Sequence, residues 1–304
     1  MTMAMTVLGP VPGSELGVVM PHEHLTCNAV RIDPDLILND VELVIDEAKL
    51  LWAAGGGTIV EVSSQGLGRN PGVLQRIARE TSLNVIMGSA WYHERVYPPH
   101  LARLTVNEIA DQIVSDIVVG VADTGIRSGI IGEVGCAADF VSPVEERVLR
   151  AAARAHTRTG LAIITHGDFS PIGLLQLDIF AEERADLRRV IVSHCDSCPE
   201  SDYHLAVARR GAFVEFDLVR GANEWETKRH VRWLTALWQE GYGAQILLSQ
   251  DVCKPRHLHA YGGFGYDYLL REFVPQLAAA GFTNEQIEVM LVVNPRRALV
   301  GDLD

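Results

Sequence analysis

Histidines gather at the ends of predicted β-strands. The stretch "VMPHEHLTC" (19–27) places His22 and His24 two residues apart, directly after the apolar run from Gly17 to Pro21. Successive residues of a strand point to opposite faces, so both imidazoles point into the same space and Glu23 points away from them. Two imidazoles on one face can bind one divalent cation.

Other candidate ligands follow other apolar runs. A lone histidine after a strand is most often a hydrogen-bonded structural residue, but four histidines and an aspartate at strand ends favour a metal site. We predict two cations with these ligands: His22, His24 and Asp251 for the first, His166 and His194 for the second.

Two neighbouring cations repel one another, so the protein must supply an anionic bridge between them. Glu133 is the candidate, because it follows the apolar run Gly129 to Gly132 and an acid in such surroundings is costly to bury without a cation. The alternative is a structural ion pair between Glu133 and an arginine such as Arg127.

The elements that must position these residues are short β-branched runs separated by stretches with helical periodicity. Strands that are apolar on both faces, with helices between them, indicate a parallel sheet covered by helices. We predict eight strands: Gly17 to Pro21, Thr58 to Val62, Asn84 to Gly88, Gly129 to Val134, Ala162 to Thr165, Arg189 to Ser193, Ala212 to Phe216 and Gln245 to Ser249.

Helix signals lie between these strands. Asp40 is a predicted cap of a helix that stops at Gly55, and Ser142 opens a capping box with proline at the first helical position. Longer amphipathic helices are predicted over 104–123, 230–240 and 265–280. Eight strands with eight helices favour a (β/α)8 TIM barrel over an open doubly wound sheet. Because no linker-like segment divides the chain, we expect one domain over 1–304.

Composition limits the function. A net charge of -13 argues against nucleic-acid binding. No apolar run is long enough to span a membrane and no signal peptide is evident, so we expect a cytoplasmic protein. The number of cysteines is odd, five, which favours reduced thiols; the isolated pair Cys195 and Cys198 is a weak zinc or redox signal.

The loops after the strands are expected to choose the substrate. Trp91 and Tyr92 follow the third strand and could line a pocket, although core packing is an equal alternative for Trp91. The loop after the eighth strand carries a basic cluster that could hold a carboxylate or phosphate, or could simply be solvated. Its members are Lys254, Arg256 and His257, and Arg220 could join them.

Several motifs resemble the phosphotriesterase family of the amidohydrolase superfamily, in order and spacing, from about residue 6 to 300. They are "PHEHL" (21–25), "ITHGDF" (164–169), "VSHCD" (192–196), "LLSQD" (247–251), "GGFGYDYL" (262–269) and "NPRRAL" (294–299). The resemblance implies a (β/α)8 barrel with two metal ions, usually zinc, held by the histidines and aspartate above. Where the founding members have a carbamylated lysine, this chain has Glu133, as in the phosphotriesterase homology branch.

These residues could carry out hydrolysis. Two divalent cations that share a water lower its pKa from ~15.7 towards 7 and give a bridging hydroxide, while one cation polarises the substrate oxygen. Asp251 can accept the proton of that water, but Gln250 cannot pass it on as a base. The expected function is a metal-dependent hydrolase of a small ester, lactone or phosphoester.

Two alternatives remain open at this stage: an amide or N-acyl hydrolase on the same centre, and a metal-binding barrel without turnover. Zinc is the expected metal, with manganese, cobalt or iron as alternatives. The expected partner is a small-molecule substrate, with neither nucleic acid nor membrane, and family habit suggests a homodimer.

Overall fold

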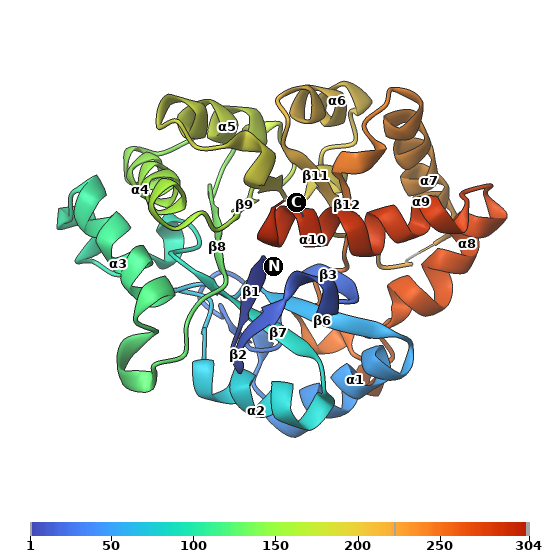
Figure 1. The fold of residues 1–304 in the computed structure, drawn as a ribbon, viewed down its shortest axis with the longest axis horizontal. Helices are drawn as coiled ribbons and strands as arrows, with labels where there is room; N and C mark the ends of the chain where they lie inside the picture. The colour runs from blue at the N-terminus through green and yellow to red at the C-terminus, as the bar shows by residue number, and fades with distance from the viewer. Residues whose placement is uncertain (1, 222, 302–304) are drawn as a thin grey trace.

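A barrel of parallel strands forms the centre of the computed structural model, which describes residues 2–221 and 223–301 (Figure 1). Within these residues the sheet has eight strands in sequence order around the barrel. They are β3 (Val18–Glu23), β6 (Gly56–Glu61), β7 (Asn84–Ser89), β8 (Ile130–Gly135), β9 (Ile163–His166), β10 (Val190–Val192), β11 (Phe213–Phe216) and β12 (Ile246–Leu248). The predicted fold and all eight predicted strands are confirmed, and no strand end is displaced by more than two residues.

Helices follow the strands and form the outer layer of the barrel (Figure 1). They are α1 (Val41–Ala53), α2 (Pro71–Thr81), α3 (Val106–Val118), α4 (Pro143–Thr159), α5 (Ile172–Glu182), α6 (Ser201–Arg209), α7 (Glu224–Gln239) and α8 (Val274–Ala279). The predicted caps are present, since Asp40 accepts the N–H of Leu43 and Ser142 forms a capping box with Glu145. None of the described helices is both apolar enough and long enough to cross a membrane.

The core has two layers because each strand is buried on both faces. One group of buried side chains, including Val60, Ile164 and Leu247, fills the barrel interior. A larger group lies between the strands and the helices. Successive residues of a strand therefore point alternately into the barrel interior and towards the helices, as a barrel requires.

One end of the barrel is covered by the two ends of the described chain. The hairpin of β1 (Met3–Thr6) and β2 (Gly9–Pro12) lies there beside α10 (Asn294–Val300) (Figure 1). A short helix, α9 (Asn284–Glu288), leads into α10 through a π-helical segment, Val289–Val293. The opposite end of the barrel contains the carboxyl ends of the eight strands and is surrounded by the loops that follow them.

Three helices begin or end at residues other than those predicted from the sequence. The helix predicted over 104–123 is α3, which starts after the capping residue Thr105 and ends at Val118, because Gly120 has a positive φ of 124°. The helix predicted over 230–240 starts earlier, at Glu224, where Asn223 caps it. The segment predicted over 265–280 becomes helical near Leu269, as a π-helical turn followed by α8.

Candidate metal centre

The predicted ligands meet at the open end of the barrel. His22 lies near the end of β3 and His24 follows it, Glu133 lies in β8, and His166 ends β9. His194 and Asp251 come just after β10 and β12, and both have left-handed backbone conformations, with φ of 54° and 48°. Such conformations are strained for residues other than glycine and often occur at functional sites.

The carboxylate of Glu133 lies between two pairs of imidazoles. Its Oε2 is 2.6 Å from His166 Nδ1 and 3.5 Å from His194 Nε2. On the other side, His22 Nε2 is 3.8 Å from Oε2 and His24 Nε2 is 3.9 Å from Oε1. Burial alone would raise the pKa of Glu133, but the imidazoles, His166 foremost, outweigh it and hold that pKa below its usual range. The alternative pairing with Arg127 is absent among the described contacts of Glu133.

Asp251 lies beside one of these pairs. Its Oδ1 is 3.2 Å from His24 Nε2, and its Oδ2 accepts a hydrogen bond from Arg220. Arg220 also donates to the backbone carbonyl oxygens of Gln250 and Asp251, at 2.8 and 2.9 Å. Burial opposes ionisation of Asp251, yet Arg220 and His24 lower its pKa well below the usual value. Arg220 therefore holds the aspartate in place as an anion.

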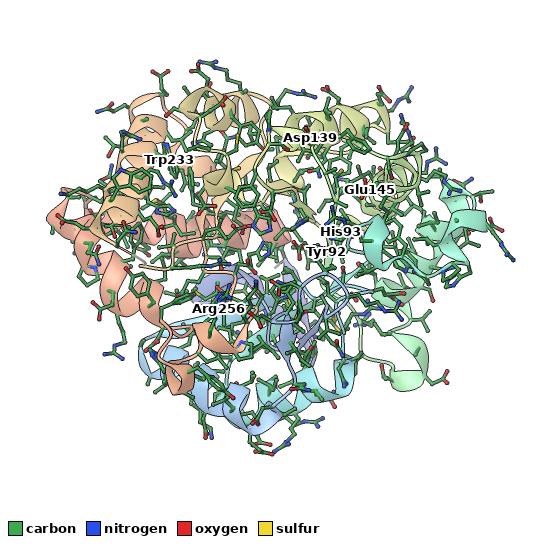
Figure 2. The ribbon with its side chains drawn as sticks, turned by 180° about the vertical axis from the view of Figure 1, so that it is seen from behind. Tyr92, His93, Asp139, Glu145, Trp233 and Arg256 are labelled. Atoms are coloured by element: carbon green, nitrogen blue, oxygen red, sulfur yellow. The ribbon has the colours of Figure 1, made fainter. Side chains whose placement is uncertain are left out.

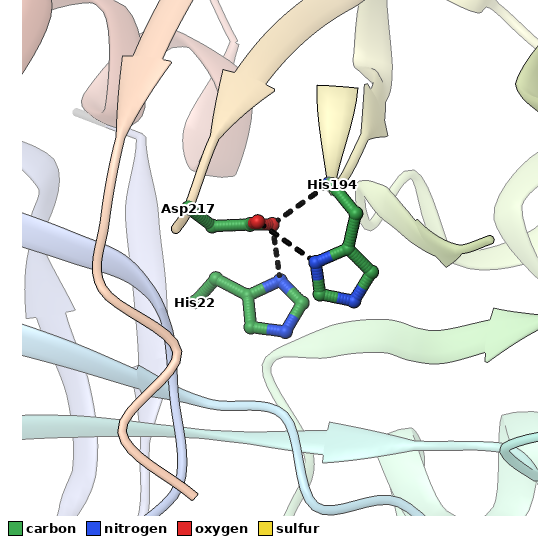
Figure 3. Close-up of side chains that lie close together, drawn as sticks. All are labelled: His22, His194 and Asp217. Atoms are coloured by element: carbon green, nitrogen blue, oxygen red, sulfur yellow. Dashed lines mark hydrogen bonds and ion pairs between the residues drawn. The ribbon is translucent and has the colours of Figure 1, made fainter. Parts of the chain in front are cut away.

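Two carboxylates that the sequence analysis missed contact the Nδ1 atoms of these histidines, and Figure 3 shows one of them, Asp217. Asp217 Oδ1 is 2.7 Å from His194 Nδ1, and its Oδ2 is 3.2 Å from His22 Nδ1. Glu215 Oε2 is also 3.2 Å from His22 Nδ1. Both acids belong to "FVEFD" (213–217), and two acids at the end of an apolar strand were the signal that could have identified them.

These contacts determine which ring nitrogen of each histidine remains available. An acid at Nδ1 of His22 and His194 holds the Nδ1 proton, so Nε2, which faces Glu133, is the nitrogen that could bind a cation in place of its own proton. Ser63 has the same effect on His24, because its hydroxyl donates to the Thr26 carbonyl and so accepts from His24 Nδ1, at 2.7 Å. The Nε2 atom of His22 is buried and has no hydrogen-bond partner among the described residues.

The donor set fits divalent cations. Two compact groups of ligand atoms share Glu133 and could each hold an ion: His22, His24 and Glu133, and Glu133, His166 and His194. An orphaned buried imidazole nitrogen, together with His166 Nδ1 only 2.9 Å from His194 Nε2, is an arrangement that a cation would satisfy. A third group, His22, His194 and Asp217, consists of Nδ1 contacts and fits the orienting role better.

A cavity of about 630 Å³ opens above this cluster. Tyr92 lines it, and its Oη lies 2.9 Å from His166 Nε2. Burial, with Glu133 as the next cause, raises the pKa of Tyr92 well above its usual value, so the hydroxyl keeps its proton. The volume is in the range of sites for small molecules.

The other predicted substrate residues lie in different surroundings. Trp91 is buried in the core, so the packing alternative applies. Lys254 lines the cavity but is ion-paired with Asp33. Arg256 is exposed and pairs with Asp35 at 3.1 Å, outside the cavity lining.

His257 is also outside the cavity lining. Its ring stacks on Phe264, with centroids 5.1 Å apart, and its Nδ1 accepts the N–H of Cys253 at 3.3 Å. Burial, followed by the charge of Arg220, lowers its pKa to about 3, so this imidazole is neutral at physiological pH. Arg256 and His257 thus lie outside the lining of the cavity that Lys254 and Arg220 line.

Comparison with known proteins agrees with this geometry. The sequence model of the phosphotriesterase family matches residues 2–299. This chain belongs to the phosphotriesterase family. The resemblance seen in the sequence motifs is thus confirmed, and because the family and its structural neighbours are hydrolases, this member of the family is a hydrolase as well.

Individual relatives cover nearly the whole chain. The phosphotriesterase homology protein of Escherichia coli (strain K12) is 35% identical over 281 residues, 92% of this chain and 96% of the relative. Its crystal structure, complexed with phosphate in the active site, has a TM-score of 0.89 and covers 93% of this chain and 98% of that chain. N-acetyltaurine hydrolase of Danio rerio is 32% identical and covers 97% of each protein. A mutant of a phosphotriesterase-like lactonase from Deinococcus radiodurans is 28% identical, with a TM-score of 0.86 over 97% of this chain and 99% of that chain.

Proposed function

We propose that this family member is a metal-dependent hydrolase that cleaves a small ester, lactone or phosphoester. The observation that carries the proposal is the position of Glu133 between two pairs of imidazoles, each of which directs a ring nitrogen towards its carboxylate. His22, His24 and Asp251 would hold one cation, His166 and His194 the other, and Glu133 both. Imidazole and carboxylate ligands suit zinc, and manganese, cobalt or iron are the alternatives.

Divalent cations in such a site lower the pKa of water towards 7 and polarise a carbonyl or phosphoryl oxygen. Two side chains of this chain would move or hold protons during the reaction. Asp251 is the proton acceptor for the attacking water, and Arg220 keeps it ionised. With His166 Nδ1 as the ligand atom, its Nε2 would carry the ring proton and donate it to Tyr92 Oη, at 2.9 Å, so that the hydroxyl would keep its own proton to donate to a substrate oxygen.

The proton cannot leave through the residue before Asp251. The Gln250 side chain is used structurally, since its Nε2 donates to the Gly265 carbonyl and its Oε1 accepts the N–H of Leu269 at 2.8 Å. Asp251 must therefore return its proton to the leaving group or to solvent in the cavity. This route differs from a relay through a neighbouring base.

Asp251→Asn tests the proposal. The amide cannot accept a proton, so we expect kcat to fall by about 10²–10⁴-fold. Wild type and variant are assayed, loaded with zinc or manganese, on lactones, aryl esters, phosphodiesters and N-acyl amino acids. Asp46→Asn, on the exposed face of α1, is the control. Activity that survives in Asp251→Asn contradicts the role of this residue, and two bound metals without turnover on any substrate would indicate a metal-binding barrel.

A second candidate function is hydrolysis of an N-acyl amide on the same centre. It is favoured by relatives named N-acetyltaurine hydrolase, including the Danio rerio protein that covers 97% of this chain. The same side chains would serve, because amide and ester cleavage both develop negative charge on a carbonyl oxygen. Comparing N-acyl amino acids with lactones in the panel separates the two candidates.

A further inference from the structure

We propose that His93 and Arg95 form an anion-binding arm that selects substrates carrying a carboxylate or sulfonate group. This inference rests on the proposed hydrolase function, because it concerns the substrate of the same cavity. Both residues follow β7 and line the cavity beside Tyr92. Viewed from the open end of the barrel, Tyr92 and His93 lie next to each other near its centre (Figure 2).

His93 offers a hydrogen-bond donor to the cavity. It is 4% exposed, and its Nδ1 accepts the backbone N–H of Arg95 at 3.3 Å. A ring nitrogen that accepts carries no proton, so the proton of the neutral ring is on Nε2. Nε2 has no hydrogen-bond partner within the described ranges. This atom is not among the fully buried polar atoms without a partner, so it reaches the cavity surface and can donate to a ligand there.

Arg95 is the cation of the cavity wall that lacks a carboxylate partner among the residues described. The other two are already neutralised, Arg220 by Asp251 and Lys254 by Asp33. The guanidinium of Arg95 is exposed at the rim and can form a bidentate contact with a carboxylate or sulfonate. The basic residues of the loop after β12 therefore do not provide this charge, and the loop after β7 does.

The arm is close to the candidate metal centre and firmly attached. The ring centroids of His93 and His166 are 5.9 Å apart, so a substrate group bound at His93 Nε2 would be separated by only a short linker from a bond placed at the candidate metal centre. The buried carboxylate of Glu145 accepts the N–H of Glu94 at 3.2 Å and that of Ala137 at 2.8 Å. The turn that carries the arm is thereby fixed before a ligand arrives, which limits the entropy lost on binding.

Two acids also line the cavity. Asp139 and Asp168 are exposed and line the cavity from the loops after β8 and β9. Asp168 Oδ2 is 3.8 Å from His166 Nε2, whereas Arg95 lies on the loop after β7. Both acids repel an anionic substrate group, so Arg95 is the charge of the described cavity wall that remains to attract it.

Matched substrates test the arm. The zinc-loaded protein is assayed on N-acetyltaurine, N-acetyl-β-alanine and neutral N-propylacetamide, and on 3-acetoxypropanoate with neutral propyl acetate. We expect kcat/KM to be at least about tenfold higher for the anionic members, the size of one charge-assisted contact. Arg95→Met should lower this preference about tenfold through a higher KM for the anionic members, and Arg95→Lys should restore part of it. Arg103→Met, an exposed arginine outside the cavity lining, is the matched control.

A binding measurement separates this inference from the proposed function. Calorimetry on zinc-loaded Asp251→Asn compares N-acetyltaurine with N-propylacetamide, with and without the Arg95→Met change. Selective binding that depends on Arg95, without wild-type turnover of any matched substrate, would support the arm and contradict the proposed cleavage of these ester and amide bonds. Turnover with equal kcat/KM for charged and neutral members, or a preference that Arg95→Met leaves unchanged, would overturn the arm and leave the hydrolase assignment standing.

Discussion

Glu133 is the residue on which both halves of the proposed metal centre depend. Replacing it with alanine removes the carboxylate that faces all four imidazoles, and two cations without an anion between them repel strongly. We expect Glu133→Ala to reduce bound metal from two ions per chain towards one, measured by elemental analysis after dialysis. Asp139→Ala, in the cavity wall but outside the candidate ligand groups, is the control. Full occupancy in Glu133→Ala would refute the bridging role.

Single residues were predictable where chain geometry alone decides their position. His22 and His24 were assigned from the two-residue period of a strand, and His166 and His194 from the convergence of parallel strand ends. Glu215 and Asp217 were missed because nothing local distinguishes an acid that orients a histidine from one exposed to solvent. The ion pair of Arg256 could not be predicted for a related reason: its partner, Asp35, is 221 residues away in the sequence.

At the scale of elements, one side chain of α4 holds two loops of the cavity. Glu145 is 1% exposed and accepts the N–H groups of Glu94, Ala137 and Ser142. The capping box that the sequence predicts at Ser142 is present, and Glu145 completes it from the third helical position. The local pattern could not indicate that the same carboxylate also reaches the loops after β7 and β8, because those contacts depend on how the barrel packs.

Glu145→Ala should therefore act on both stability and activity. Leaving buried N–H groups without a partner costs about 1–3 kcal/mol each, and the loop carrying Tyr92 is no longer fixed. We expect a lower urea midpoint and a lower kcat with little change in KM. Glu145→Gln should restore part of kcat, because its amide oxygen can still accept from Glu94 and Ala137. Equal kcat for Gln and Ala variants, both folded, would show that Glu145 is only structural; Glu146→Gln, exposed on the same helix, is the control.

At the scale of the whole molecule, the barrel is completed at the seam between β12 and β3, which end the order of the sheet. Ser249 Oγ accepts the N–H of His22 at 3.0 Å and lies 2.8 Å from Glu23 Oε1. Glu23 also accepts the N–H groups of Gln250 and Val252, at 2.9 and 2.8 Å. Glu23 thus points away from the metal centre, as the alternation of β3 predicts, and it joins the two ends of the sheet. The sequence of either strand alone could not predict that Glu23 joins β3 to the segment after β12.

Ser249→Ala tests whether the contacts between β3 and the segment after β12 affect both the stability of the barrel and metal binding. The change leaves the N–H of His22 without its hydroxyl partner in a fully buried position, so we expect a loss of about 1–3 kcal/mol in the free energy of unfolding by urea. Ser128→Ala is the matched control, because Ser128 is equally buried but its hydroxyl makes one bond, to the Gly88 carbonyl at 3.1 Å. Since His22 is a proposed ligand, Ser249→Ala should also weaken metal binding, whereas Ser128→Ala should not. Equal destabilisation and unchanged metal affinity in both variants would mean that the barrel closes independently of Ser249.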